Sequence, residues 1–380
     1  MERTTLGEIA AVFLRLGTTA FGGPAAHVAM MRDEVVRRRG WLTDAELLDL
    51  LSAANLIPGP NSTELAIHVG WARRRWAGLA VAGLSFILPA ALITAALAWA
   101  YVRFGALPEA DRLLWGVKPV ILAVVVQAIV GLAPHAARTV PLRLLGIVAA
   151  VAAALGAHEL VVLLGAGLLV AVVRAVRSRG AGGNAALPAL GPLFPVAAGA
   201  AGLSAVGAVT LPAIFWLFCR TGAVLFGSGY VLVAFLRTDL VERLGWLTEA
   251  QLLDAVAAGQ VTPGPVFTTA TFVGWLLAGP AGAAAATAGI FLPAFVFVAL
   301  SAPFVPRLRA SRTAGAFLDG VNVASVALMA VVTARLAPAA LVDLRAALLG
   351  LLAAVLLVRY RTGSVVLVLG GAAAGLIIGP

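Results

Sequence analysis

The chain has 380 residues, of which 62% are hydrophobic and only 12% are charged, and its mean hydropathy is +1.02. This composition excludes a soluble domain, which needs more polar surface, and predicts an all-α polytopic membrane protein. The net charge of +10 is carried by arginines that gather in short loops, as is usual beside membrane spans, so nucleic acid is not an expected partner.

Apolar runs predict six spans in the first half of the chain, at about residues 8–31, 44–72 (a broken segment), 77–101, 114–133, 142–156 and 159–175. The uncharged run Ala77–Ala100 would measure roughly 36 Å as a helix, enough to cross a hydrocarbon core of about 30 Å. A linker, RSRGAGGNAALPALGP, leads to the apolar run Leu193–Leu211, which we interpret as an additional span. The apolar runs of the second half predict spans at about 212–236, 248–277, 281–302, 318–336, 343–358 and 364–379.

The two halves of the chain carry the same motifs. At an offset of 205, residues 21–60 and 226–265 share 19 identities in 40 positions, which chance does not explain even in a biased composition. We therefore predict an N-terminal repeat over 1–176, a linker with the extra span over 177–209, and a C-terminal repeat over 210–380.

The extra span and the loop charges predict the orientation of the halves. A single span between two sets of six turns the second set upside down. Arg73–Arg75 correspond to the uncharged Ala278–Ala281, whereas the charged loops of the second half correspond to neutral or balanced loops of the first. We expect inverted repeats, related by a rotation about an axis in the membrane plane. Arg37–Arg39 fit this scheme only if 44–72 is a re-entrant hairpin, and the sequence leaves spanning and re-entrant forms of 44–72 and 248–277 open.

A PGP motif interrupts each half, in NLIPGPNSTEL (Asn55–Leu65) and in QVTPGPVFTTA (Gln260–Ala270). Proline cannot donate a backbone hydrogen bond and glycine permits unusual backbone angles, so each motif predicts a discontinuous helix. Asn61–Thr63 are typical N-cap residues for a new half-helix, and a helix N-terminus attracts anions. Inverted repeats with broken helices are typical of secondary transporters. The alternative is that PGP only kinks two packed helices.

The candidate binding residues gather at these breaks and at a second shared element, RLGTTAFGGP in the first half and RTGAVLFGSG in the second. We predict substrate contacts from Arg15, Gly22, Gly23, Gly59, Asn61, Ser62, Thr63, Lys118, Arg220, Gly227, Gly264, Thr268, Thr269 and Asn322.

Several of these residues have an equally good structural interpretation. Arg15 and Arg220 lie in apolar runs, where a guanidinium is usually functional, but a structural ion pair explains them equally well. Lys118, the only lysine, either faces a central cavity or snorkels to the interface. Glu64 is a candidate proton carrier or a helix cap, and His68 is a weaker proton candidate.

Metal and enzyme motifs are absent from the sequence. The single cysteine, Cys219, excludes an internal disulfide and a multi-cysteine metal site, and the four histidines share no ligand spacing. No HExxH motif, nucleophile elbow or P-loop is present. We therefore expect no cofactor, no metal and no enzyme.

The motifs FGGP, GWLTDAELLD and NLIPGPN, with FGSG, GWLTEAQLLD and TPGP in the second half, resemble those of the chromate ion transporter (CHR) family in its long, two-repeat form. The resemblance extends over nearly the whole chain and implies thirteen spans, oppositely oriented halves and chromate export across a bacterial inner membrane. Val266 stands where the first half has Asn61, so the two half-sites need not contribute equally.

The leading hypothesis is a secondary transporter that exports chromate from the cytoplasm, driven by the membrane potential, with proton coupling left open. Moving two negative charges out of a cell that is about 100 mV negative inside is worth about 4–5 kcal/mol. The alternatives are a transporter whose main substrate is sulfate and an intramembrane lipid-phosphate hydrolase built on Ser62, Glu64 and Arg15. Expected partners are chromate or a related oxyanion, with sulfate as a competitor, and the lipid bilayer; a homodimer is left open.

Overall fold

The computed structural model describes residues 4–21, 23–105, 107–180, 208–225, 231–304, 312–360 and 362–380. All regular secondary structure in these ranges is helical, as the composition predicts. The first half contains α1 (Leu6–Thr19), α2 (Gly23–Arg32), the π-helix η1 (Asp33–Arg38), α3 (Asp44–Ala54), α4 (Asn61–Phe104), α5 (Pro108–Ala136), α6 (Val140–Ala154) and α7 (Glu159–Gly180).

The second half follows the same order of elements. It contains α9 (Leu211–Val224), α10 (Leu232–Leu236), the π-helix η4 (Arg237–Arg243), α11 (Glu249–Val261), the 3₁₀ turn η5 (Val266–Thr268), α12 (Thr269–Ser301), the 3₁₀ turn η6 (Ala302–Phe304), α14 (Arg312–Ala340), α15 (Leu344–Tyr360) and α16 (Ser364–Ile378). The predicted span Leu193–Leu211 lies outside the described residues except for its last four.

Five helical segments in the described ranges are long and apolar enough to cross a membrane: Asn61–Phe104, Pro108–Ala136, Glu159–Arg177, Val266–Ser301 and Gly315–Ala340. Three shorter apolar helices accompany them: Val140–Ala154, Leu211–Val224 and Ser364–Ile378. Lengths and composition therefore agree with a multi-pass membrane protein.

The prediction of one continuous span over 8–31 is wrong, because two helices lie there. α1 ends at Thr19, and Ala20 takes an extended backbone (φ −81°, ψ 97°) before α2 begins at Gly23. The span predicted at 212–236 is interrupted in the same place: α9 ends at Val224 and Leu225 is extended (φ −85°, ψ 112°). Hydropathy does not reveal these ends, because the residues around them are as apolar as a continuous span.

The long elements α4 and α12 each contain a sharp bend. In α4 the bend is at Arg74 and Arg75, where Arg75 has φ 50°. In α12 it is at Ala278 and Gly279, where Gly279 has φ 60°. A short half-helix therefore precedes each bend, and a long membrane helix follows it.

Glycine pairs allow the two arms of each bend to pack closely. A Cβ on Gly70 would lie 2.2 Å from the carbonyl oxygen of Gly78, and one on Gly274 would lie 2.3 Å from that of Gly282. Only glycine fits such an approach between two backbones. Both bends therefore depend on the same pair of small residues, 204 positions apart.

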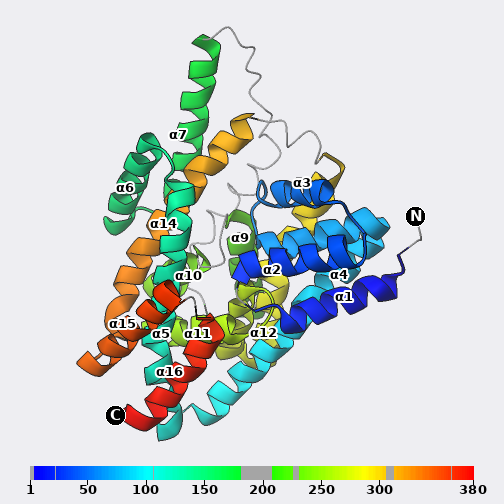
Figure 1. Ribbon diagram of the computed structural model, residues 1–380. Helices are drawn as coiled ribbons and strands as arrows, with labels where there is room; N and C mark the ends of the chain where they lie inside the picture. Colours follow the sequence, from blue (N-terminus) through cyan, green and yellow to red (C-terminus); the bar gives the residue numbers. More distant parts are fainter. Residues whose placement is uncertain are drawn as a thin grey trace.

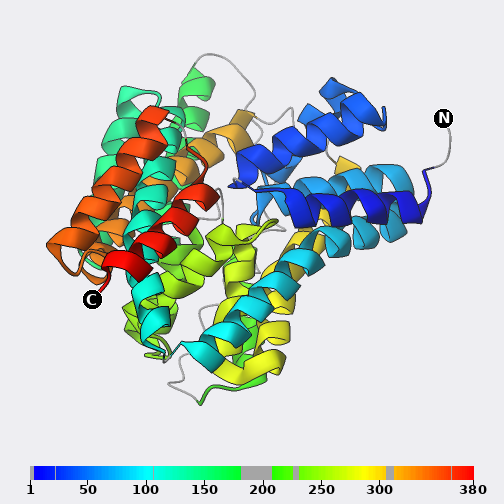
Figure 2. The same ribbon diagram turned by 60° about the horizontal axis from the view of Figure 1, so that its bottom comes forward.

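The helices form two groups (Figures 1 and 2). The first consists of α1–α4 with α9 and α12, and the second of α5–α7 with α14–α16, while α10 and α11 lie between them. In the second group the halves of the chain exchange partners: α5 packs against α15 and α16, and α14 packs against α6 and α7. The two halves therefore form one structure and do not stand as separate domains.

Candidate functional site

The two PGP motifs form backbone breaks that are bonded to the opposite half of the chain. α3 ends at Ala54 and α4 begins only at Asn61, with Gly59 between them at φ 138°. The Gly59 N–H donates to the carbonyl oxygen of Leu225, just after α9, at 2.7 Å.

The second break makes the reciprocal bond. Gly264 has φ 87°, and its N–H donates to the carbonyl oxygen of Ala20, just after α1, at 2.9 Å. Gly264 and Leu225 each lie 205 residues after their counterparts Gly59 and Ala20. Each PGP loop thus satisfies a backbone carbonyl at the end of the first helix of the other half, which a buried interrupted helix requires.

The half-helix after the first break begins without a side-chain cap. The N-cap residue is Pro60, so the prediction that Asn61–Thr63 supply the cap is wrong. Asn61 instead donates from Nδ2 to Oδ1 of Asn55 at 2.6 Å, which closes the PGP loop. The hydroxyls and the positive end of this helix are therefore not used in capping.

Unpartnered polar side chains gather on the first two turns of this half-helix. Thr63, Glu64 and His68 have no exposed surface. In the described part of the chain no hydrogen-bond partner reaches the Thr63 hydroxyl, either carboxyl oxygen of Glu64 or either ring nitrogen of His68. Glu64 and His68 are four residues apart and share one helix face. We call Thr63, Glu64 and His68 the α4 polar cluster.

The carboxyl group of Glu64 lies directly against the break. A Cβ added to Gly59 would meet Glu64 Oε1 at 2.3 Å. The cluster and the PGP loop are therefore in contact, and any group held at the break lies beside Glu64.

His27 connects the two interrupted segments of the first half, a role that the sequence reasoning did not assign to it. It is 1% exposed, its Nδ1 lies 3.2 Å from Ser62 Oγ, and its Nε2 lies 3.1 Å from the carbonyl oxygen of Ala20. The same carbonyl accepts the bond from Gly264. The signal in the sequence is a histidine six residues after Phe21 of FGGP, where the second half has Leu232.

The second break is less polar and better satisfied. The Thr268 hydroxyl donates to the carbonyl oxygen of Pro265, and the Thr269 hydroxyl donates to that of Val266, each at 2.9 Å. The buried Nε2 of Gln260 has no partner among the described residues. The unpartnered polar groups of the two breaks therefore concentrate at the first break, and an unequal contribution to substrate binding stays a prediction.

Arg15 and Arg220 both take part in ion pairs. Arg15 pairs with Glu34 of η1, and Arg220 pairs with Asp239 of η4, at positions 205 residues apart. Both carboxylates are buried, at 4% and 5% exposure of the side chain. The arrangement is the structural alternative that the sequence left open, and substrate contact by either arginine stays a prediction.

Lys118 is held by a buried carboxylate between α5 and α11. Its Nζ lies 3.3 Å from Asp254 Oδ1, and Tyr101 donates from its hydroxyl to Asp254 Oδ2 at 3.0 Å. The sequence reasoning did not select Asp254, although the shared LLD triplet places Asp49 at the same position of the first half. Asn322, the counterpart of Lys118, is exposed.

The candidates Gly22 and Gly227 lie outside the described residues, and Gly23 is the first residue of α2.

We expect Lys118→Met to destabilise the protein by about 3 kcal/mol, because it leaves Asp254 buried without its cation. Lys118→Met combined with Asp254→Asn should recover the folded yield in detergent size-exclusion chromatography and also recover transport. Recovery of the fold without recovery of transport would mean instead that Lys118 contacts the substrate.

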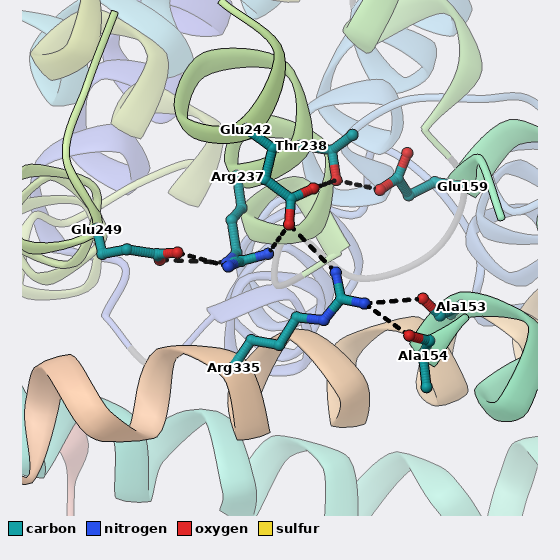
Figure 3. Close-up of polar contacts among 8 residues, drawn as sticks. All are labelled: Ala153, Ala154, Glu159, Arg237, Thr238, Glu242, Glu249 and Arg335. Carbon is teal, nitrogen blue, oxygen red and sulfur yellow. Dashed lines mark hydrogen bonds and ion pairs between the residues drawn. The ribbon is translucent and has the colours of Figure 1, made fainter. Parts of the chain in front are cut away.

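An arginine cluster beside η4 does not provide an anion site (Figure 3). Arg237 pairs with Glu242 and, at 2.5 Å, with Glu249. Arg335 pairs with Glu242 at 3.2 Å and donates to two carbonyl oxygens at the end of α6, at 3.1 and 3.0 Å. Both guanidinium groups are already neutralised, so the cluster fastens η4 to α11, α14 and α6.

Comparison with known proteins assigns both halves of the chain to one family. The profile of the chromate transporter family matches residues 7–171 and again residues 212–376. A chromate transport protein of Cupriavidus metallidurans is 35% identical over 375 residues, which cover 97% of this chain and 92% of that protein. A probable chromate transport protein of Synechococcus elongatus is 32% identical over 351 residues, covering 92% and 89% of the two chains.

A further relative is the chromate transport protein of Pseudomonas aeruginosa, which is 33% identical over 340 residues, covering 87% of this chain and 80% of that protein. No solved structure matches the chain. Two separate matches to one profile, and relatives that are similar over 80–92% of their own length, confirm the resemblance that the motifs indicate. The chain belongs to the chromate transporter family.

Proposed function

We propose that the protein exports chromate from the bacterial cytoplasm across the inner membrane, and that the anion is held where the PGP break meets the start of α4. The observation that carries this proposal is the α4 polar cluster at an uncapped helix N-terminus. Unpartnered polar groups at membrane depth are costly and are usually retained for function. Hydroxyls and the positive end of a helix suit a tetrahedral oxyanion.

The architecture that we propose is a pair of inverted repeats, 1–176 and 210–380, joined by a linker with an extra span over 177–209. The reciprocal bonds Gly59–Leu225 and Gly264–Ala20 support this, because an exchange of equivalent bonds is what a two-fold relation between the halves produces. The equivalent ion pairs of Arg15 and Arg220 support it further. In transporters of this kind the substrate binds where the repeats meet.

Glu64 gives the proposed site a coupling mechanism. A carboxylate would repel a divalent anion beside it, so the two bind together only when the carboxyl group carries a proton. We assign the proton-binding role to Glu64, with His68 one turn further along the same face as the next acceptor. At roughly 100 mV the membrane potential supplies about 4–5 kcal/mol for outward movement of two negative charges, and about half of that when one proton moves out with the anion.

The lipid-phosphate hydrolase alternative lacks its arginine. Ser62 contacts His27, but the Arg15 side chain is 51% exposed and paired with Glu34. A nucleophile, a base and a cation are therefore not brought together around Ser62, as a hydrolase would require. The relatives named above carry transport names, which agrees with a protein that is not an enzyme.

The test is flux of labelled chromate from proteoliposomes under an imposed potassium-diffusion potential. We expect efflux to accelerate when the interior is negative and to exceed that of protein-free liposomes. Competition by sulfate and molybdate measures selectivity, and release of inorganic phosphate from the lipid measures hydrolysis. Efflux that is insensitive to the potential, or phosphate release without chromate flux, would overturn the proposal.

A further inference from the structure

A cavity of about 780 Å³ lies between α6, α7 and the beginning of α14, away from both PGP breaks. These three elements pack against one another at the upper left of Figure 1. Three arginines line the cavity, Arg138, Arg174 and Arg177, together with a set of leucines and valines. The volume is in the range of sites that hold organic ligands, which is about 300–1,000 Å³.

The cavity carries an excess of positive charge. Arg138 pairs with Asp319 at 2.5 Å, and among the described residues that line the cavity Asp319 is the only carboxylate. Arg174 and Arg177 are exposed and have no carboxylate partner in the described part of the chain. Two guanidinium groups without a carboxylate partner, beside apolar side chains, attract an anion.

The beginning of α6 adds to this field. Its N-cap residue, Thr139, and the N1/N2 proline, Pro141, both line the cavity, so the positive end of a 15-residue helix faces the same space. Helix N-termini favour negative groups such as phosphate. The polar part of the cavity therefore fits a phosphate group.

The remaining lining is apolar and opens outward. Leu169 and Val173 on α7 are 53% and 41% exposed, on a helix that is long and apolar enough to cross a membrane. A small hydrophilic anion gains nothing from such side chains, whereas acyl chains do. We propose that the cavity binds an anionic phospholipid, with the phosphate between the three arginines and the acyl chains along α7.

The second half lacks this site, although it has the same helices. The positions 204 residues after Arg138 and Arg174 are Val342 and Ile378. Next to Val342, the carboxylate of Asp343 accepts a hydrogen bond from Trp115 Nε1 at 3.2 Å and so connects α5 to the turn before α15. In inverted repeats the equivalent ends of the two halves face opposite leaflets of the membrane. Arginines concentrate on the cytoplasmic side, where anionic lipids attract them.

The test is titration of the purified protein with phosphatidylglycerol or phosphatidylcholine, with bound lipid counted by native mass spectrometry. We expect Arg174→Gln with Arg177→Gln to weaken phosphatidylglycerol binding roughly thirtyfold, at about a factor of five for each charge, and to leave phosphatidylcholine unchanged. The matched control is Arg345→Gln with Arg359→Gln, which removes two exposed arginines from α15 and should bind like the wild type.

A second variant keeps the charges and fills the space. Leu145→Trp should also weaken phosphatidylglycerol binding, because its indole occupies the cavity. Undiminished binding by both variants would overturn the proposal. Displacement of the bound lipid by inorganic phosphate at a similar concentration would overturn it too, since it would mean that the site takes a small anion.

Discussion

Gly59→Ala is expected to lower the affinity for chromate at least about tenfold while most of the protein still folds. The added Cβ would lie 2.3 Å from Glu64 Oε1, so the carboxyl group must move away from the break. The φ of 138° also strains any residue with a side chain, at a cost of about 1–3 kcal/mol. The measurement is equilibrium binding of chromate to the purified variant, with the folded yield followed by size-exclusion chromatography.

Gly40→Ala is the matched control. Gly40 has φ 58°, but nothing lies within 4 Å of its added Cβ, so the variant carries backbone strain without a new contact. We expect Gly40→Ala to lose some stability and to bind chromate normally. Equal affinity in the two variants, with a collapsed yield for Gly59→Ala, would mean that the PGP motif only kinks the chain.

Gly264→Ala is expected to act through packing. Its added Cβ would lie 2.9 Å from the Cβ of Ala90 and 3.0 Å from the carbonyl oxygen of Gly17. These atoms belong to the helices of the first half and cannot rotate away as the end of a flexible side chain can. The two PGP glycines therefore differ in what surrounds them, and only Gly59 lies against an ionisable group.

Glu64→Gln is expected to abolish chromate transport driven by a pH gradient while chromate–chromate exchange continues. Glutamine keeps the size and polarity of the side chain but cannot bind and release a proton. Because the anion site itself is retained, exchange at equal pH on the two sides should proceed. Proteoliposomes loaded with unlabelled chromate measure the exchange. A pH jump measures the driven flux, which in Glu64→Gln should fall to the rate of protein-free liposomes.

The control for this pair of assays is Glu109→Gln, which changes an exposed carboxylate in the first turn of α5. It should leave both fluxes unchanged. A Glu64→Gln variant that still accumulates chromate under a pH gradient would remove Glu64 from the coupling mechanism and leave it as a structural group.

Local chemistry in the sequence predicts much of the helical layout. The runs at 142–156 and 159–175 correspond closely to α6 and α7, because a short turn that contains Gly156, at φ 89°, separates them. Breaks within an apolar run are harder to predict. The division of 8–31 into α1 and α2 is invisible to hydropathy, since the carbonyl oxygen of Ala20 at the end of α1 is bonded to His27 after the break and to Gly264, which is distant in the sequence.

The same distinction applies to the candidate site. The sequence identifies Asn61, Ser62, Thr63 and Glu64 because they follow a recognisable break. It does not identify the residues that complete the surroundings, because Asp254 reaches Lys118, and His27 reaches Ser62, only through the packing of separate helices. Residue type and spacing therefore predict where a half-helix begins, whereas pairing within the membrane depends on the tertiary structure.

The central claim is that chromate binds at the α4 polar cluster, and equilibrium binding to Thr63→Val tests it most directly. The Thr63 hydroxyl is fully buried and has no partner among the described residues, whereas that of Thr333 in α14 donates to Met329 at 2.7 Å. Loss of one hydrogen bond to a charged ligand should weaken chromate binding by about tenfold in Thr63→Val, and Thr333→Val should bind like the wild type. Unchanged affinity in a folded Thr63→Val variant would contradict the account and place the anion elsewhere.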